Sequence, residues 1–254
     1  VDASTKFDKW SEFCNQALGE TSEDSEESLT EADVRNAKVD YPLDSNTLHC
    51  MGVDLGVTCH ITIGRIQDGR PLVVHRQKVL YTELERVRSE LCAKYKVVTS
   101  VHDMFPYTDI VTRIVNFDPN AFGAIYVEKK STETHSVKEQ EEDPEEGKLN
   151  VKAVMINRNV AFDELMETFK SRSILVSGLD EEFVQHLQDM KRVKKFDKQQ
   201  QVRYVWEKTN GIDHWHHSLL YFYIATKLIG MASGWTNVGA VPLVSSFRVN
   251  PNMS

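Results

Sequence analysis

A nearly continuous apolar run, Thr47–Val57, opens a series of three segments that have the pattern of β-strands. Cys59–Ile66 alternates through apolar positions, and Leu72–Leu80 follows a turn at Asp68-Gly69-Arg70-Pro71. Short apolar segments bounded by Gly, Pro and Asp are typical of strands joined by tight connections. We therefore predict an antiparallel meander of three strands.

Downstream of the meander, helical and strand patterns alternate. The segment Thr82–Tyr95 has Leu84, Val87 and Leu91 on one helical face, which is typical of an amphipathic helix. Three antiparallel strands followed by this alternation predict an α/β fold, a mixed sheet with helices on both faces. The further predicted elements are strands at Lys96–Asp103, Gly123–Glu128, Lys152–Asn157 and Ser173–Val176, helices at Tyr107–Asn116, Val160–Ser171, Asp180–Met190 and Asp213–Ala232, and a hairpin of strands Met190–Phe196 and Val202–Glu207.

The first 46 residues have a different pattern. Residues 1–19 carry apolar positions spaced for one face of a short helix. Thr30 followed by Asp33 predicts a capped helical turn, with Thr30 at the N-cap. We interpret residues 1–46 as a linker region and residues 47–254 as the domain proper.

The net charge of -8 argues against a nucleic-acid partner until its distribution is considered. Residues 20–27 hold five acids and residues 139–146 hold six, with no Lys or Arg in either run. Both runs are polar and lack apolar periodicity, as expected of a solvated linker and a loop tip. Subtracting these 11 acids from 38 leaves 27 acids against 30 basic residues. The globular part is therefore mildly basic, and a nucleic-acid partner stays possible.

Neither a membrane span nor a disulfide framework is expected. The longest apolar stretch, Leu219–Ala232, is broken by Lys227 and is shorter than the roughly 20 residues that a bilayer span needs. The N-terminus shows no basic or apolar region of a secretory signal. The four cysteines include no CxxC pair, which favours a reducing cytoplasm.

Three aspartates lie where chemistry is expected. Asp54 falls inside an apolar strand, where an ionised carboxylate is costly unless it is paired, hydrogen-bonded or metal-bound. Asp103 ends a strand, and the carboxyl ends of strands in open α/β sheets are where ligands bind. Asp213 opens the last helix. Each also has a purely structural interpretation. Asp54 could end the strand and cap a turn at Gly56, Asp103 could cap a turn or helix, and Asp213 could be an ordinary helix N-cap.

Taken together, the three carboxylates predict one oxygen-rich site for Mg²⁺ or Mn²⁺. Such a site can hold two ions roughly 3.5–4 Å apart that act in phosphodiester cleavage.

The segment His214-Trp215-His216-His217 also suggests a metal, but without HExxH or a nearby cysteine the zinc signal is weak. His217 lies one turn after Asp213, so it could orient that carboxylate or assist a proton transfer. His214 is a second candidate for an assisting role. The structural alternative is that these histidines pack beneath the sheet.

The predicted hairpin is strongly basic, with Phe196 and Tyr204 interleaved. This combination suits phosphate contact plus base stacking, as in binding to a nucleic acid. A solvated charged hairpin is the alternative. The candidate DNA-binding residues are Lys191, Arg192, Lys194, Lys195, Lys198 and Arg203.

Three motifs resemble the nuclease domain of tailed-bacteriophage large terminase subunits. They are Gly52-Val53-Asp54-Leu55-Gly56, then Val101-His102-Asp103 leading to Phe105-Pro106-Tyr107-Thr108-Asp109, and finally Gly211-Ile212-Asp213-His214-Trp215-His216-His217-Ser218-Leu219-Leu220-Tyr221. They occur in the family's order over about residues 47–232. Residues 1–46 are similar to the segment that links the family's packaging ATPase to its nuclease, and the chain has no GxxxxGK[ST] loop.

The resemblance implies an RNase H-like fold and a metal-dependent endonuclease that cuts concatemeric viral DNA during packaging. Asp54, Asp103 and Asp213 would be the metal ligands, and the hairpin would touch DNA. His214 stands where some members have a fourth acid. The resemblance also implies an ATPase domain in the same subunit, a portal protein and a small terminase subunit as partners. It implies that the DNA is cut in the host cytoplasm and that the isolated domain is a monomer.

Three rival interpretations stay open. One is a non-enzymatic docking module, which predicts that Asp54 is structurally satisfied without a metal. A resolvase or transposase-type nuclease of the RNase H superfamily would share the three acids. Gly-Val-Asp-Leu-Gly-Val-Thr at residues 52–58 also resembles the first phosphate loop of sugar kinases and Hsp70-like ATPases. That interpretation requires a second Asp-x-Gly loop and a Gly-Gly adenosine motif, which we do not see.

Overall fold

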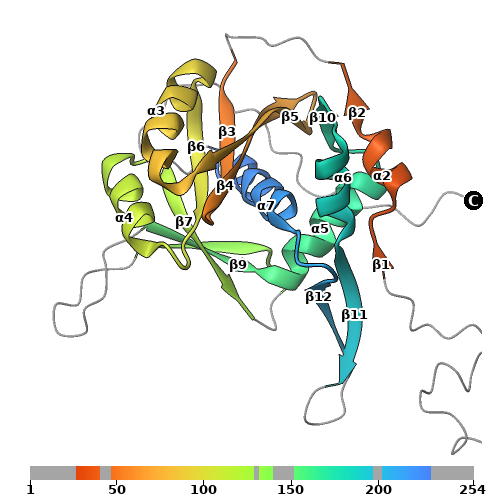
Figure 1. The fold of residues 1–254 in the computed structure, drawn as a ribbon. Helices are drawn as coiled ribbons and strands as arrows, with labels where there is room; N and C mark the ends of the chain where they lie inside the picture. The colour runs from red at the N-terminus through yellow and green to blue at the C-terminus, as the bar shows by residue number, and fades with distance from the viewer. Residues whose placement is uncertain (1–26, 41–46, 129–131, 140–151, 197–201, 230–254) are drawn as a thin grey trace, which may run out of the picture.

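The computed structural model describes residues 27–40, 47–128, 132–139, 152–196 and 202–229. Within them the main feature is a nine-stranded sheet, in the order β2-β10-β5-β4-β3-β6-β7-β9-β8 (Figure 1). Its strands are β2 Lys38–Val39, β3 His49–Asp54, β4 Thr58–Gln67, β5 Arg70–Leu80, β6 Val97–Asp103, β7 Ala121–Val127, β8 His135–Glu139, β9 Lys152–Asn157 and β10 Leu175–Ser177.

The centre of this sheet has the predicted RNase H-like arrangement. β3, β4 and β5 form the antiparallel meander, while β6 pairs in parallel with β3, β7 with β6, and β9 with β7. The order β5-β4-β3-β6-β7 with β4 reversed confirms the mixed α/β sheet expected from the sequence. The edge strand β8, which pairs antiparallel with β9, was not predicted.

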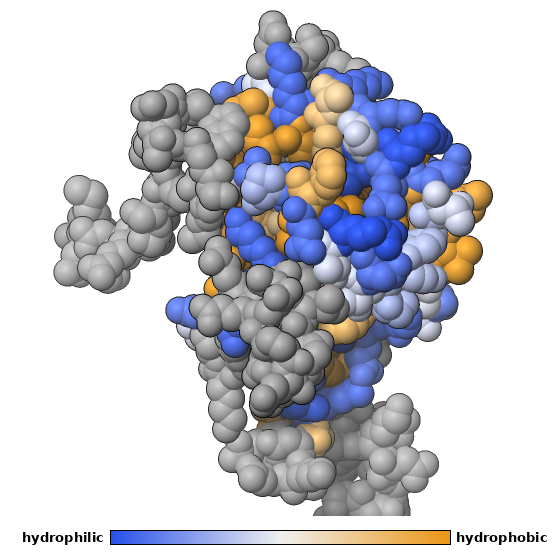
Figure 2. Space-filling view, turned by 90° about the vertical axis from the view of Figure 1, so that its left-hand side faces the viewer, coloured by the Kyte–Doolittle hydropathy of each residue, from blue (hydrophilic) through white to orange (hydrophobic). Residues whose placement is uncertain are grey.

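Helices cover both faces of the sheet, as expected. One face packs against α3 (Leu84–Tyr95, after the 3-10 turn Tyr81–Glu83) and α4 (Thr108–Phe117). The other packs against α2 (Glu31–Asn36), α5 (Arg158–Lys170), α6 (Glu181–Gln188) and α7 (His214–Lys227). Figure 2 shows the α3 and α4 side of the molecule, where hydrophilic side chains predominate and apolar ones are scattered among them.

Helix α7 lies directly on the central strands because two glycines leave room for it. A Cβ built on Gly52 of β3 would be 2.1 Å from the backbone nitrogen of Phe222 and 2.3 Å from the carbonyl oxygen of Ser218. A Cβ on Gly64 of β4 would meet the Phe222 ring at 2.6 Å. The hydroxyls of Thr62 and Ser218 lie 2.8 Å apart across the same interface. This close packing fixes where α7 begins relative to the ends of the strands.

The segment before residue 47 joins the fold where it is described. Thr30 caps α2 as predicted, in a capping box with Asp33. Leu29, Val34 and Ala37 are buried in the same core as α7, and β2 pairs with β10. Residues 27–40 therefore pack as part of the domain body. The amphipathic helix predicted in residues 1–19 lies outside the described residues, and the domain boundary at residue 47 stays a prediction.

The predicted basic hairpin is present as β11 (Met190–Phe196) and β12 (Val202–Lys208). The two-residue strand β1 (Glu27–Ser28) pairs with β11 and completes a small separate sheet. The hairpin projects from the body of the molecule, and its second strand leads into α7 (Figure 1).

None of the helices in the described residues is long and apolar enough to cross a bilayer. The apolar stretch that begins at Leu219 lies in α7, where Leu219, Leu220, Phe222 and Ile224 are fully buried. This part of the prediction, a buried helix, is confirmed.

Candidate metal centre

The three aspartates singled out in the sequence come from three elements that meet at one edge of the sheet. Asp54 is the last residue of β3, Asp103 is the last residue of β6, and Asp213 is the N-cap of α7. The parallel register pairs Gly52 with Val101 and Val53 with His102. Continuing this register by one residue sets Asp54 beside Asp103 at the carboxyl ends of neighbouring strands.

Side-chain alternation directs both strand carboxylates toward α7. The missing Cβ of Gly52 would point into α7, so Asp54, two residues later, is on the same face. Val101 belongs to the core shared with α7, so Asp103 is on that face as well. His214, the residue after Asp213, contacts Asp54, so the start of α7 lies at the same edge of the sheet. The three aspartates are not, however, a group within the described residues whose ligand atoms all lie within 4.8 Å of one another. Their shared role as metal ligands remains a prediction.

The carboxylates lie in a partly desolvated setting. Asp54 and Asp213 are each only 5% exposed, and Asp103 is of intermediate exposure. Burial, followed by the nearby negative charge of Asp54, raises the pKa of Asp103 to about 6. A bound cation would favour the ionised form of a carboxyl group whose pKa is raised by burial and by a neighbouring carboxylate. The site has the charge and the donor atoms that Mg²⁺ or Mn²⁺ requires.

Asp213 is held by a polar chain that starts on β7. Nε2 of His217 lies 3.2 Å from a carboxylate oxygen of Asp213, and the hydroxyl of Tyr126 lies 2.7 Å from Nδ1 of the same ring. Burial alone would raise the pKa of Asp213, but the hydrogen bond and charge of His217, aided by Lys208, bring it well below its usual range. Asp213 is therefore ionised at neutral pH. The contact between Asp213 and His217 expected from helical spacing is present.

His214 lies beside Asp54 and not beside His217. Its Nδ1 is 2.9 Å from Oδ2 of Asp54, and this contact raises the pKa of His214. His216 is instead fully buried, packed edge-on against Phe162. The histidines of residues 214–217 thus face different surroundings, so they do not form the zinc site among themselves that their spacing suggested.

Sequence reasoning missed His60, the residue that faces Asp54 across the β3–β4 pair. His60 is 4% exposed, and its ring stacks on that of His214 with centroids 4.9 Å apart. Ligand atoms of Asp54, His60 and His214 all lie within 4.8 Å of one another. The predicted meander contained the signal, because residues 54 and 60 straddle its first tight turn and a hairpin places such residues opposite each other.

A second missed residue, Asp189, fixes the loop that leads into α7. Its carboxylate accepts hydrogen bonds from the backbone N–H groups of Asn210, Gly211 and Ile212, at 2.6, 2.9 and 3.1 Å. The backbone N–H of Trp215 donates to Nδ1 of His186, at 3.1 Å. The end of α6 thereby holds both sides of Asp213. No sequence signal marked Asp189, since a carboxylate that caps a distant loop has no local pattern.

Replacing Asp189 by Ala should lower the free energy of unfolding by about 3 kcal/mol, because three backbone donors lose a charged acceptor in a buried place. Chemical denaturation monitored by circular dichroism measures this. Thr30→Ala is the matched control, since the Thr30 hydroxyl accepts one backbone hydrogen bond, from Asp33 at the start of α2, and its loss should cost about 1 kcal/mol. Equal losses for the two variants would contradict the loop-holding role of Asp189.

The basic residues of the hairpin have different local partners. Arg192 is bound to Asp163 of α5 at 2.9 Å and stacks over the Tyr204 ring, which ties the hairpin to the body. Lys195 is paired with Glu207, and Arg203 with Glu128 at 3.3 Å. Lys191 and Lys194 lie on β11, and Lys198 lies outside the described residues. Phe196 and Tyr204 are exposed, at 61% and 40%.

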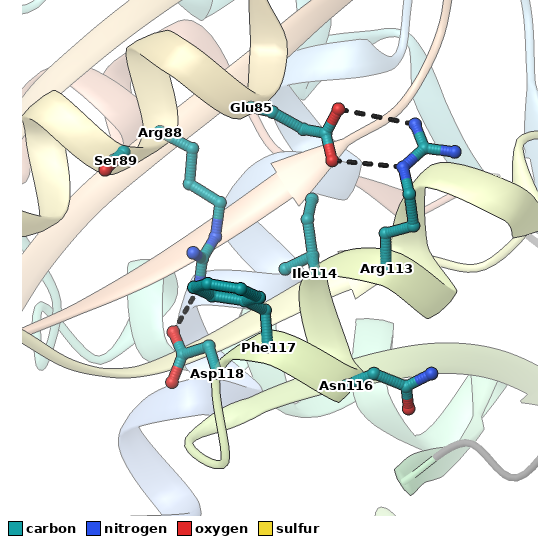
Figure 3. Close-up of a pocket in the computed structure, with 8 residues that line it drawn as sticks. All are labelled: Glu85, Arg88, Ser89, Arg113, Ile114, Asn116, Phe117 and Asp118. Atoms are coloured by element: carbon teal, nitrogen blue, oxygen red, sulfur yellow. Dashed lines mark hydrogen bonds and ion pairs between the residues drawn. The ribbon is translucent and has the colours of Figure 1, made fainter.

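A cavity of about 530 Å³ lies between α3 and α4 (Figure 3). Figure 3 shows Glu85 of α3 paired with Arg113 of α4 at its rim, and Arg88 reaching Asp118. Arg88 also donates to the Ser100 hydroxyl at 2.9 Å. This cavity is on the face of the sheet opposite α7, so it is separate from the three aspartates.

Comparison with known proteins gives solved structures alone. No family model matches the chain, and no curated protein matches it. The large terminase nuclease of thermophilic phage G20c is 13% identical, with a TM-score of 0.46 over 73% of this chain and 84% of that one. The nuclease domain of the Thermus phage P74-26 large terminase is 11% identical, with a TM-score of 0.45 over 76% and 93%.

The large terminase of a further thermophilic bacteriophage is 11% identical, with a TM-score of 0.45 over 77% of this chain and 42% of that chain. The present chain thus matches less than half the length of that protein. Structures of the G20c nuclease hold bound magnesium, cobalt or zinc. Identities and TM-scores this low do not carry a function from those proteins to this chain.

Proposed function

We propose that this chain is the metal-dependent endonuclease domain of a viral terminase large subunit, and that it cleaves concatemeric double-stranded DNA during genome packaging. The observation that carries the proposal is the meeting of Asp54, Asp103 and Asp213 at one sheet edge, on three separate elements. Asp54 and Asp213 are buried, and burial, followed by the charge of Asp54, raises the pKa of Asp103; this is the setting expected of carboxylates that share a cation. The terminase-like motifs at the same three positions support the same function.

In this proposal the three aspartates hold Mg²⁺ or Mn²⁺, with two ions in the working state. When bound, two such ions supply an activated water and stabilise the leaving oxygen of a phosphodiester. The residues of the chain prepare this site. His217 and Tyr126 keep the Asp213 carboxylate oriented and ionised, while His214 engages Asp54. The packing of α7 on Gly52 sets the spacing between Asp213 and the two strand acids.

The proposed substrate and partners follow from the same identification. They are double-stranded DNA, an ATPase domain of the same subunit, a portal protein and a small terminase subunit. The expected location is the host cytoplasm, and the isolated domain is expected to be a monomer.

Incubating supercoiled plasmid with the purified chain tests the enzyme activity. We expect nicked and linear products with Mn²⁺ or Mg²⁺ and none with EDTA. Plasmid that stays intact in every metal would contradict the proposal. Cleavage confined to four-way junctions would instead favour the resolvase alternative.

The β11–β12 hairpin is proposed as the DNA-contacting element beside the site. Its exposed aromatic residues alternate with basic ones, and its second strand leads directly to Asp213. Such a surface suits backbone contact and stacking. Arg192 is better interpreted as a residue that holds the hairpin in place, because Asp163 and Tyr204 already occupy its guanidinium.

Neutralising Lys194 and Lys195 together by Lys→Gln should weaken DNA binding and reduce the slope of log K against log salt by about 2, close to one unit for each phosphate that is no longer neutralised. Fluorescence anisotropy at several salt concentrations measures the slope. The matched control is Arg86→Gln with Lys94→Gln, two exposed charges on α3, far from the hairpin in Figure 1. An unchanged slope in the hairpin variant would indicate that the hairpin is a solvated charged element that does not contact DNA.

A further inference from the structure

Beside the three aspartates lies a second set of donors that includes two imidazoles. Asp54, His60 and His214 come from β3, β4 and the first turn of α7, and their ligand atoms lie within 4.8 Å of one another. Asp54 is common to both sets. The three are brought together by the β3–β4 register and by the seating of α7, the same packing that positions Asp213.

The burial and hydrogen bonding of His60 indicate that these three residues have a role beyond packing. The ring is almost fully buried, and its Nδ1 has no hydrogen-bond partner among the residues that the structure describes. Buried polar atoms normally have a partner, so an orphan one needs an explanation. The ring is surrounded by other aromatic groups, with His214 stacked on one side and Trp215 edge-on at 4.7 Å. An imidazole ring that neighbouring rings fix beside a carboxylate is preorganised as a metal ligand.

The donor chemistry selects the kind of cation. Imidazole nitrogen suits Zn²⁺ and other transition-metal ions, whereas Mg²⁺ prefers carboxylate, carbonyl and water oxygens. Two nitrogens and one carboxylate make a three-ligand set. Asp54 and His60 are buried, while the side chain of His214 is 46% exposed. That exposure leaves solvent access for a fourth ligand, which is the pattern of an open metal site and not of a closed structural one.

We infer that Asp54, His60 and His214 form a binding site for a divalent transition-metal ion, distinct in its ligands from a magnesium site of three aspartates. The inference deepens the proposed function and rests on it for any catalytic meaning, because Asp54 is shared. It makes the centre a mixed one, with an oxygen-rich side at Asp103 and Asp213 and a nitrogen-containing side at His60 and His214. Transition-metal ions will therefore bind this chain more tightly than Mg²⁺ does.

Cobalt is the probe that tests the site, because Co²⁺ bound by imidazole has visible absorption bands that depend on its ligands. The whole chain is titrated with Co²⁺ alone, and affinity is measured by absorbance and by calorimetry. His60→Phe keeps a ring in the stack but removes both nitrogens, and His214→Gln removes the second imidazole. Each should weaken Co²⁺ binding at least tenfold, since substitutions even behind a metal ligand cost 10- to 100-fold.

His75→Gln is the matched control. His75 is a partly buried histidine on β5 that stacks on Tyr95 and lies outside this cluster, so its replacement should leave Co²⁺ binding unchanged. Circular dichroism checks that each variant is folded. Equal Co²⁺ affinity and an equal spectrum in wild type and His60→Phe would overturn the inference.

The two proposals fail separately. Histidine-dependent Co²⁺ binding without any DNA cleavage would support the metal site and contradict the proposed nuclease activity. DNA cleavage with Mg²⁺, together with Co²⁺ binding that is unchanged in both histidine variants, would support the nuclease and contradict the metal site.

Discussion

Asp54→Asn should reduce metal-dependent plasmid cleavage by about 10³-fold or more. Asp54 belongs to both proposed metal sites. A bound metal contributes several kcal/mol to transition-state stabilisation, and each 1.4 kcal/mol equals a factor of about ten in rate. The substitution keeps the shape of the side chain and removes the charge. Initial rates of plasmid nicking at saturating Mn²⁺ measure the loss, and Asp103→Asn and Asp213→Asn should behave alike.

Asp68→Asn is the matched control for Asp54→Asn. Asp68 is an exposed residue of the β4–β5 turn, with a positive φ that Asn also tolerates. It should keep full activity. Each aspartate variant should give the wild-type circular dichroism spectrum, so that reduced activity reports the site and not the fold. A folded Asp54→Asn protein that cuts plasmid at the wild-type rate would rule out Asp54 as a metal ligand in catalysis.

Gly52→Ala should damage both stability and activity, with an expected loss of about 3 kcal/mol in the free energy of unfolding and about 10²-fold in cleavage rate. The added Cβ would meet backbone atoms of α7 at 2.1 and 2.3 Å, and backbone cannot rotate away as a side chain can. The helix must therefore move off β3, which overpacks or displaces the core. A shift of about 1 Å in a positioning element can cost 10²-fold in rate.

Gly56→Ala is the control for Gly52→Ala. It lies two residues beyond Asp54, and a Cβ there would have its nearest contact at 3.2 Å, from the carbonyl oxygen of Thr58. Its thermal midpoint should stay within a few degrees of wild type, whereas that of Gly52→Ala should fall by about 6–12 °C, at roughly 2–4 °C per kcal/mol for a domain of this size. A Gly52→Ala protein as stable as wild type would show that α7 does not need this close approach.

Much of the fold could be predicted because its signals are local. The apolar run around Val53, the turn at Asp68 and the helical spacing of Leu84, Val87 and Leu91 each depend on neighbours within a few residues. The structure agrees with these elements to within a few residues at their ends, where boundaries are least determined by pattern. β8 was missed because it is a short polar edge strand whose pairing with β9 supplies the order that its own residues do not encode.

The candidate site was predictable in one respect and not in another. Asp54 could be selected as a carboxylate inside an apolar run, although its predicted position within the strand was wrong, because β3 ends at that residue. Asp103 could be selected at a strand end and Asp213 at a helix start, and the carboxyl ends of parallel strands share an edge. His60 and Asp189 could not be selected in this way. The role of His60 depends on its cross-strand neighbour, and the role of Asp189 depends on a distant loop whose backbone N–H groups its oxygens bind.

The amino-acid sequence alone determined the alternation of elements, the mixed sheet and the identity of the three acids, because burial periodicity and turn chemistry act over short distances along the chain. Tertiary structure decided which side chains meet. Gly52 and Gly64 allow α7 to lie on β3 and β4, and that seating carries Asp213 to the strand ends and sets His214 against Asp54 and His60. Contacts of this kind depend on packing between residues as much as 166 positions apart, and no local pattern records them.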